Sequence, residues 1–132
     1  MEDTRNNNKI ELEYTLNTAP VIIYSRLSTP SGLAEWFADD VKLSGKIYTF
    51  IWDKSQQKAE LVEKKENKYV KFKWLKEGSS PKNYFMFRIH VHELTGEVAL
   101  QLTEILDNSE DKEDAISLWN YQIGELKRVL GV

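Results

Sequence analysis

The chain has no cysteine among its 132 residues, which excludes disulfides, thiolate metal sites and cysteine nucleophiles. It also has no excess of positive charge, because 18 basic and 21 acidic residues give a net charge of -3. A positive field that would hold nucleic acid or an anionic membrane is therefore missing. No window approaches the roughly 18 apolar residues of a membrane span, and the polar N-terminus has no signal-peptide core. We expect a cytoplasmic protein without nucleic-acid partners or integral membrane association.

Recognisable catalytic and cofactor motifs are also missing. The sequence has no glycine-rich phosphate loop, no grouping of serine, histidine and acid, and no paired carboxylates at a defined spacing. His90 and His92 have the only spacing that suggests zinc, but a third ligand is lacking and both fall on the strand face opposite the apolar one. We therefore predict no metal, no cofactor and no enzymatic activity.

The C-terminal segment has a pattern typical of a long amphipathic helix from Asp114 to Leu130. Its apolar positions recur at spacings of three and four residues: Ala115, Leu118, Trp119, Ile123, Leu126, Val129 and Leu130. Such a stripe needs a surface to cover it, and the preceding eighty residues read almost entirely as short strands. The length fits one domain, which we place at residues 9–132 after a flexible tail of residues 1–8.

The strand pattern begins at residues 9–17, where Ile10, Leu12, Tyr14 and Leu16 alternate with polar residues. Two short helices follow, the first capped by Thr18 and the second started by Thr29 and Pro30. A brief strand is predicted between Asp39-Asp40 and Ser44-Gly45, and further strands at residues 46–52, 58–66, 69–75, 84–92 and 97–106. The class is α+β: a curved antiparallel sheet of about seven strands wrapped around a long C-terminal helix, with two short helices after strand one.

This order and several local patterns resemble the helix-grip fold of the START-like superfamily, particularly its activator-of-Hsp90-ATPase-like branch and small START-like proteins of Bacteroidota. The patterns are Pro20, Val21 and Tyr24; Pro30-Ser31-Gly32-Leu33; Glu35-Trp36-Phe37-Ala38; Phe50-Ile51-Trp52; Val70-Lys71-Phe72-Lys73-Trp74; and Trp119. The resemblance implies a cavity between the sheet and the C-terminal helix that accepts an apolar small molecule or lipid. Members of the branch that stimulate Hsp90 carry a second, N-terminal domain, which we do not expect in this protein.

The residues expected to line that cavity are mostly aromatic, and such side chains line pockets as readily as they fill solid cores. They are Tyr48, Phe50, Trp52, Phe72, Trp74, Phe85, Phe87, Glu104, Trp119 and Gln122. Glu104 is in phase with the inward residues of its strand, but we favour its exposure because an inward acid is costly unless paired. Gln122 lies beside the helix stripe and either contacts a ligand or hydrogen-bonds the sheet.

Two further groups have alternative interpretations. Trp36 and Phe37 either gate the cavity mouth or pack between helix and sheet, and packing is favoured. Six lysines on one hairpin suggest an electrostatic footprint, but neighbouring glutamates largely neutralise it, so we expect a solvated strand face. The lysines are Lys64, Lys65, Lys68, Lys71, Lys73 and Lys76.

We therefore predict noncatalytic binding of a hydrophobic small molecule or lipid. The alternative is a protein-interaction or co-chaperone module of the activator-of-Hsp90-ATPase-like kind, and the sequence leaves a protein partner or homodimer open. An enzyme of the cyclase or hydrolase kind is a third interpretation, because START-like cavities sometimes host chemistry. A pocket above roughly 300 Å³ would favour ligand binding, and a filled interior would favour interaction.

Overall fold

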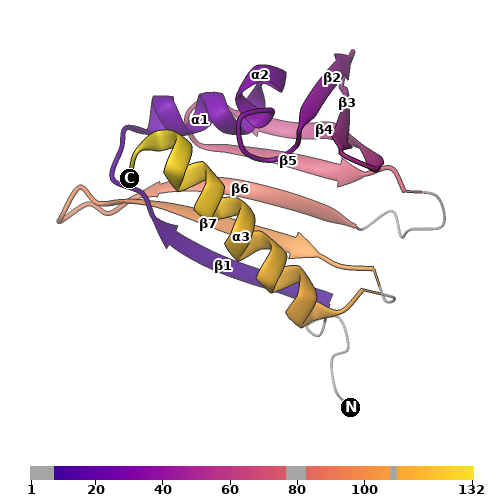
Figure 1. Ribbon diagram of the computed structural model, residues 1–132. Helices are drawn as coiled ribbons and strands as arrows, with labels where there is room; N and C mark the ends of the chain where they lie inside the picture. The colour runs from indigo at the N-terminus through magenta and orange to yellow at the C-terminus, as the bar shows by residue number, and fades with distance from the viewer. Residues whose placement is uncertain (1–7, 77–82, 108–109) are drawn as a thin grey trace.

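The computed structural model describes residues 8–76, 83–107 and 110–132, and these form the predicted α+β helix-grip fold (Figure 1). The elements in chain order are β1 (Lys9–Thr15), α1 (Pro20–Ser28), α2 (Pro30–Leu33), β2 (Asp40–Ser44), β3 (Ile47–Trp52), β4 (Ser55–Lys65), β5 (Tyr69–Trp74), β6 (Tyr84–Val91), β7 (Val98–Ile105) and α3 (Lys112–Leu130). Of the predicted tail, residues 1–7 lie outside the described part of the chain.

The seven strands make one antiparallel sheet in the order β1-β7-β6-β5-β4-β3-β2. Five hairpin connections from β2 to β7 lay these strands side by side, and β1 then pairs with β7 at the far edge. Helix α3 crosses one face of the curved sheet at β6, β7 and β1 (Figure 1). Helices α1 and α2 lie toward the side of the sheet that β2 to β5 form (Figure 1). The hydroxyl of Tyr14 on β1 donates to Asn120 Oδ1 of α3 at 2.6 Å, which ties the helix to that edge.

The alternating sequence pattern positions the strands as expected. On β1, Ile10 is buried and Leu12 and Tyr14 are half-buried, whereas Glu11 and Glu13 are exposed. The β4–β5 turn places Asn67 at φ 62°, a left-handed conformation that asparagine tolerates better than most residues. Strand β4 starts at Ser55, three residues before the predicted start, and its register shifts between Leu61 and Glu63. That bulge explains why its sequence pattern is the least regular.

The short helices differ from the prediction at one cap. Thr18 does not cap α1: Ala19 is the N-cap residue, it makes no side-chain cap bond, and Pro20 opens the helix. The prediction for α2 is confirmed, because Thr29 Oγ1 accepts from the Gly32 N–H at 3.0 Å. A Cβ at Gly32 would lie 2.1 Å from the Ser25 carbonyl oxygen, so only glycine permits this close approach of α1 and α2.

Helix α3 begins two residues earlier than predicted, because Asp111 Oδ1 accepts from the backbone N–H groups of Glu113 and Asp114. Its buried side chains are Trp119, Gln122, Ile123 and Leu126. The predicted burial of Leu118 is wrong, since this side chain is 57% exposed. Gln122 takes part in the buried stripe instead, so the face that meets the sheet is narrower and more polar than the apolar spacing indicates.

Candidate functional site

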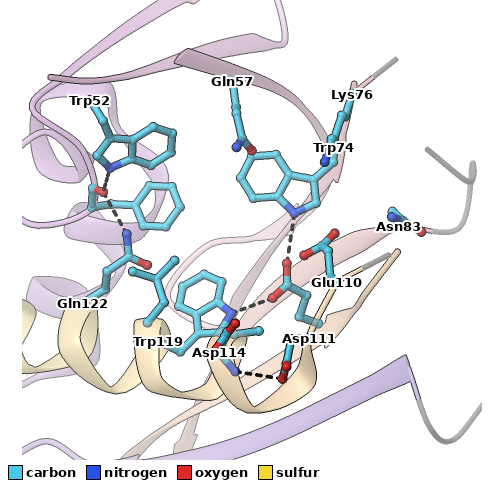
Figure 2. Close-up of a pocket in the computed structure, with 14 residues that line it drawn as sticks. Trp52, Gln57, Trp74, Lys76, Asn83, Glu110, Asp111, Asp114, Trp119 and Gln122 are labelled. Atoms are coloured by element: carbon cyan, nitrogen blue, oxygen red, sulfur yellow. Dashed lines mark hydrogen bonds between the residues drawn. The ribbon is translucent and has the colours of Figure 1, made fainter. Parts of the chain in front are cut away.

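A pocket of about 330 Å³ lies between the sheet and the N-terminal half of α3 (Figure 2). Trp52, Gln57 and Trp74 lie on its sheet side, and Trp119 and Asp114 face them from α3 (Figure 2). Its described lining is Phe37, Trp52, Gln57, Trp74, Lys76, Asn83, Glu104, Glu110, Asp111, Asp114, Ala115, Leu118, Trp119 and Gln122. The arrangement combines a large aromatic surface with a few polar groups, as in many small-molecule sites.

The central polar group is the carboxylate of Glu104, which β7 holds inside the pocket. Its expected exposure is wrong, because the residue is only 6% exposed. The indole N–H of Trp119 donates to Oε1 at 2.6 Å, and that of Trp74 donates to Oε2 at 3.1 Å (Figure 2). These two bonds supply the pairing that makes burial of an acid tolerable. Sheet, helix and carboxylate are thereby joined in one cluster.

Burial and hydrogen bonding act in opposite directions on the pKa of the Glu104 carboxyl. Burial raises the pKa of its carboxyl above the ordinary value of 4.5, and the charge of Glu110 acts in the same direction. The hydrogen bonds from Trp119 and Trp74 lower that pKa, but burial dominates. A perturbed carboxyl inside a pocket is a common property of functional sites.

A second polar junction forms at the backbone carbonyl of Phe37, after α2. The Trp52 indole N–H donates to this oxygen at 2.9 Å, and Gln122 Nε2 donates to it at 3.2 Å. Gln122 is thus both a pocket-lining residue and a hydrogen-bond partner, although the partner is the segment before β2 and not the sheet. Because both donors are held, the orientation of Trp52 and Gln122 at the pocket wall is fixed.

The open side of the pocket carries three exposed carboxylates, Glu110, Asp111 and Asp114, here called the acidic rim. Asp111 caps α3, and Glu110 Oε1 accepts from the Asp107 N–H at 3.3 Å. Lys76 is the one basic side chain among the described lining residues. Acidic residues just before and inside the first turn are typical of a helix start, where they complement the helix dipole, and no local pattern indicates that Glu110, Asp111 and Asp114 border a cavity.

The structure brings together five of the ten predicted site residues at the pocket: Trp52, Trp74, Glu104, Trp119 and Gln122. The other five lie in the neighbouring core: Tyr48, Phe50, Phe72, Phe85 and Phe87. Their rings pack against one another, as in the Phe72–Phe85 pair with centroids 5.0 Å apart. This aromatic core is continuous with the pocket wall, since the Phe85 ring also lies 4.6 Å from Trp74. Ligand contact by the five core residues stays a prediction.

Trp36 and Phe37 are both buried, and they pack in the way that the favoured alternative predicts. Trp36 donates its indole N–H to the Arg26 carbonyl at 2.8 Å and packs edge-on against Phe87. Phe37 stacks on Trp119 with centroids 5.8 Å apart, and it also lines the pocket. Phe37 is therefore a wall residue that the predicted site did not include.

The outer face of the sheet carries the remaining motifs. His90 is exposed, and its ring centroid lies 4.7 Å from that of His92. Within residues 8–76, 83–107 and 110–132, no group of three or more metal-ligating side chains is placed to hold an ion. In the hairpin, Lys71 lies over the ring of Tyr84 at 4.2 Å, and Lys64, Lys65 and Lys68 are exposed.

No helix in the described part of the chain is long and apolar enough to cross a bilayer.

Fold and pocket together define a helix-grip domain with a cavity beside its long C-terminal helix. The START-like superfamily domain matches residues 4–132, so the chain belongs to the START-like superfamily. The chain is 34% identical to BfR322 from Bacteroides fragilis, whose solution structure aligns over 92% of this chain and 90% of that one with a TM-score of 0.63.

Two more distant structures show the same fold. The Aha1 dimer from Colwellia psychrerythraea is 18% identical, with a TM-score of 0.77 over 90% of this chain and 92% of that one. Protein MLL2253 from Mesorhizobium loti is 14% identical, with a TM-score of 0.78 over 93% and 96% of the two chains. No curated protein is significantly similar in sequence.

Proposed function

We propose that the chain binds a small hydrophobic molecule without catalysis, in the pocket between the sheet and α3, and that it acts in the cytoplasm. The observation that carries this proposal is the pocket of about 330 Å³ with Phe37, Trp52, Trp74 and Trp119 in its wall. These rings offer apolar surface to a ligand, while their hydrogen bonds to Glu104 and to the Phe37 carbonyl fix the wall in place.

The size of the pocket narrows the class of ligand. Sites for small molecules span about 300–1,000 Å³, so a pocket of about 330 Å³ is at the low end of that range. A molecule with a single short chain or a small ring system fits this space, and a lipid with two long acyl chains would require the neighbouring core to open. That core is filled by buried phenylalanines such as Phe72 and Phe85, which makes opening costly.

The geometry of Glu104 supports binding over catalysis. Each carboxylate oxygen accepts one indole N–H, so the group holds Trp74 and Trp119 in position. The described lining includes no serine, cysteine, threonine, tyrosine or histidine beside it. We infer that Glu104 acts as a fixed polar contact for a ligand, because its two indole bonds hold the carboxylate in place.

Titration with N-phenyl-1-naphthylamine, an uncharged apolar fluorophore, tests the proposal. We expect the folded wild type to bind the probe saturably and stoichiometrically. Trp119→Phe should shift the affinity at least several-fold, by about 1 kcal/mol or more, because pocket shape and the bond to Glu104 both change. Native mass spectrometry of freshly purified protein would identify a co-purified ligand.

Trp36→Phe is a matched control for this experiment. It makes the same chemical change at a residue equally buried, and it removes an indole bond of 2.8 Å, but Trp36 does not line the pocket. We expect both variants to lose stability and only Trp119→Phe to change probe affinity. Absence of saturable binding to wild type would contradict the proposal and favour the protein-interaction alternative, for which the 18% identical Aha1 structure gives similarity of fold alone.

A further inference from the structure

The charges around the pocket are markedly one-sided. Among the described lining residues, the buried Glu104 and the acidic rim of Glu110, Asp111 and Asp114 contribute four carboxyl groups, against one basic side chain, Lys76. Even if Lys76 balances one of them, three acidic groups remain. Like charges disfavour a ligand anion at such a site, whereas a ligand cation would be attracted to it.

The positive end of α3 does not reverse this balance. A helix N-terminus is equivalent to about half a positive charge, and the effect fades within the first turn. Asp111 already accepts the Glu113 and Asp114 N–H groups, and Glu113 and Asp114 add two further carboxylates to the first turn. The field at this end of the helix is therefore set by the acids and not by the backbone.

The aromatic wall favours the same charge as the acids do. Indole and phenyl rings have a negative face, and tryptophan is the ring that attracts cations most strongly. Three tryptophans, Trp52, Trp74 and Trp119, line the pocket together with Phe37. The tryptophans on the sheet side lie across the pocket from the α3 carboxylates Asp111 and Asp114 (Figure 2). A ligand with an apolar body and a cationic group could therefore use both surfaces.

We propose that the ligand is a hydrophobic amine, a small apolar molecule with one ammonium group, and that the pocket discriminates against fatty acids. This inference rests on the proposed function and specifies its ligand class. The apolar body lies among Trp52, Trp74 and Trp119, and the ammonium group lies between Glu104 and the acidic rim. Within the described residues, no group of three or more metal-ligating side chains is placed to hold a metal ion.

Three ligands with the same tail test this proposal: octylamine, octanol and octanoate, each titrated calorimetrically at pH 7. We expect octylamine to bind wild type at least tenfold more tightly than octanoate, with octanol between them. Higher salt should weaken octylamine binding and leave octanol binding unchanged, since only the charged ligand is screened.

Charge-removing variants locate the ammonium site. Asp114→Asn should weaken octylamine binding several-fold without changing octanol binding, and Glu104→Gln should act in the same direction. The matched control is Glu113→Gln, which removes one charge from the same helical turn at a residue outside the pocket lining. Its effect should be clearly smaller, because a general attraction between a cation and an acidic protein does not depend on position. Asp114 is exposed, so its variant reports binding even if Glu104→Gln folds poorly.

The outcomes separate the two proposals. If octanol binds but octylamine binds no more tightly than octanoate, the pocket is a ligand site and the amine inference is wrong. If Glu113→Gln weakens octylamine binding as much as Asp114→Asn, the preference belongs to the general charge of the protein, which also overturns the inference. If none of the three ligands binds, both the amine inference and the proposed function fail.

Discussion

One continuous interior has two different ends, one filled and one hollow. At the filled end, Phe50, Phe72 and Phe85 are fully buried and pack ring against ring. At the hollow end, Trp52 and Trp74 are half-buried and border the pocket. The same strands serve both ends: β3 carries Phe50 and then Trp52, and β5 carries Phe72 and then Trp74. Because residues two apart share a face, the pocket begins one pleat beyond the last phenylalanine.

The two ends differ in whether their aromatic rings carry a polar group. Phenylalanines have no polar group to satisfy, so they close on one another to the density typical of cores. The indole N–H groups of Trp74 and Trp119 both need an acceptor, and a single carboxylate from Glu104 serves both. Those bonds hold the two rings around the acid. The hollow end is thus distinguished by indole bonds to a buried carboxylate, which hold its rings apart around the acid.

The largest expected effect is at the filled end. Phe87→Ala should reduce the free energy of unfolding by about 3–5 kcal/mol, because its fully buried ring packs against Trp36, Phe85 and Trp119. Denaturant midpoints measure the loss. A cost below about 1 kcal/mol would mean that this end is not close-packed, and the contrast between the two ends would disappear.

A smaller effect is expected at the hollow end, where it should depend on pH. Glu104→Gln should cost about 1–2 kcal/mol at pH 7, because the amide turns a donor toward one indole N–H and leaves it unpaired. Since burial raises the pKa of Glu104 in the folded state, its carboxyl adds most stability below the unfolded pKa of about 4.5 and loses that contribution as pH rises through the folded pKa.

The stability gap between wild type and Glu104→Gln should therefore widen as pH falls from 7 toward 4.5. Urea unfolding of both proteins across this range measures the gap, and effects of other titrating groups largely cancel in the difference. A gap that narrows as pH falls would show that the indole bonds, and not burial, dominate the pKa of this carboxyl.

The smallest effect is expected outside both ends, on the outer sheet face. His90→Ala should change the free energy of unfolding by less than about 0.5 kcal/mol, because His90 is exposed on the same strand that buries Phe87. A chelator should likewise leave the melting temperature of wild type unchanged. Losses equal to those of Phe87→Ala would mean that the two faces of β6 are assigned the wrong way round.

Most of the fold could be predicted because strand alternation and helix periodicity are local signals. Part of the pocket was predictable for the same reason, since Trp52, Trp74 and Trp119 fall on inward faces. The burial of Glu104 was not, because its partners lie 30 and 15 residues away and no local pattern pairs them. Leu118 was misplaced because apolar spacing alone does not reveal which edge of a stripe meets the sheet. Lys76 follows β5, and Glu110 lies between β7 and α3. Both residues are in connecting segments, where periodicity carries no information.

The indoles that surround the pocket also have an optical consequence. The chain contains four tryptophans, and Trp52, Trp74 and Trp119 line the pocket, while the fourth, Trp36, is buried in the core. Most of the intrinsic ultraviolet emission of the protein therefore originates beside the space where a guest molecule would sit. Displacement of water from those rings should change the wavelength and yield of that emission. Tryptophan fluorescence of the unlabelled protein should therefore report whether the pocket is occupied. Trp36 supplies an internal reference that a guest does not reach.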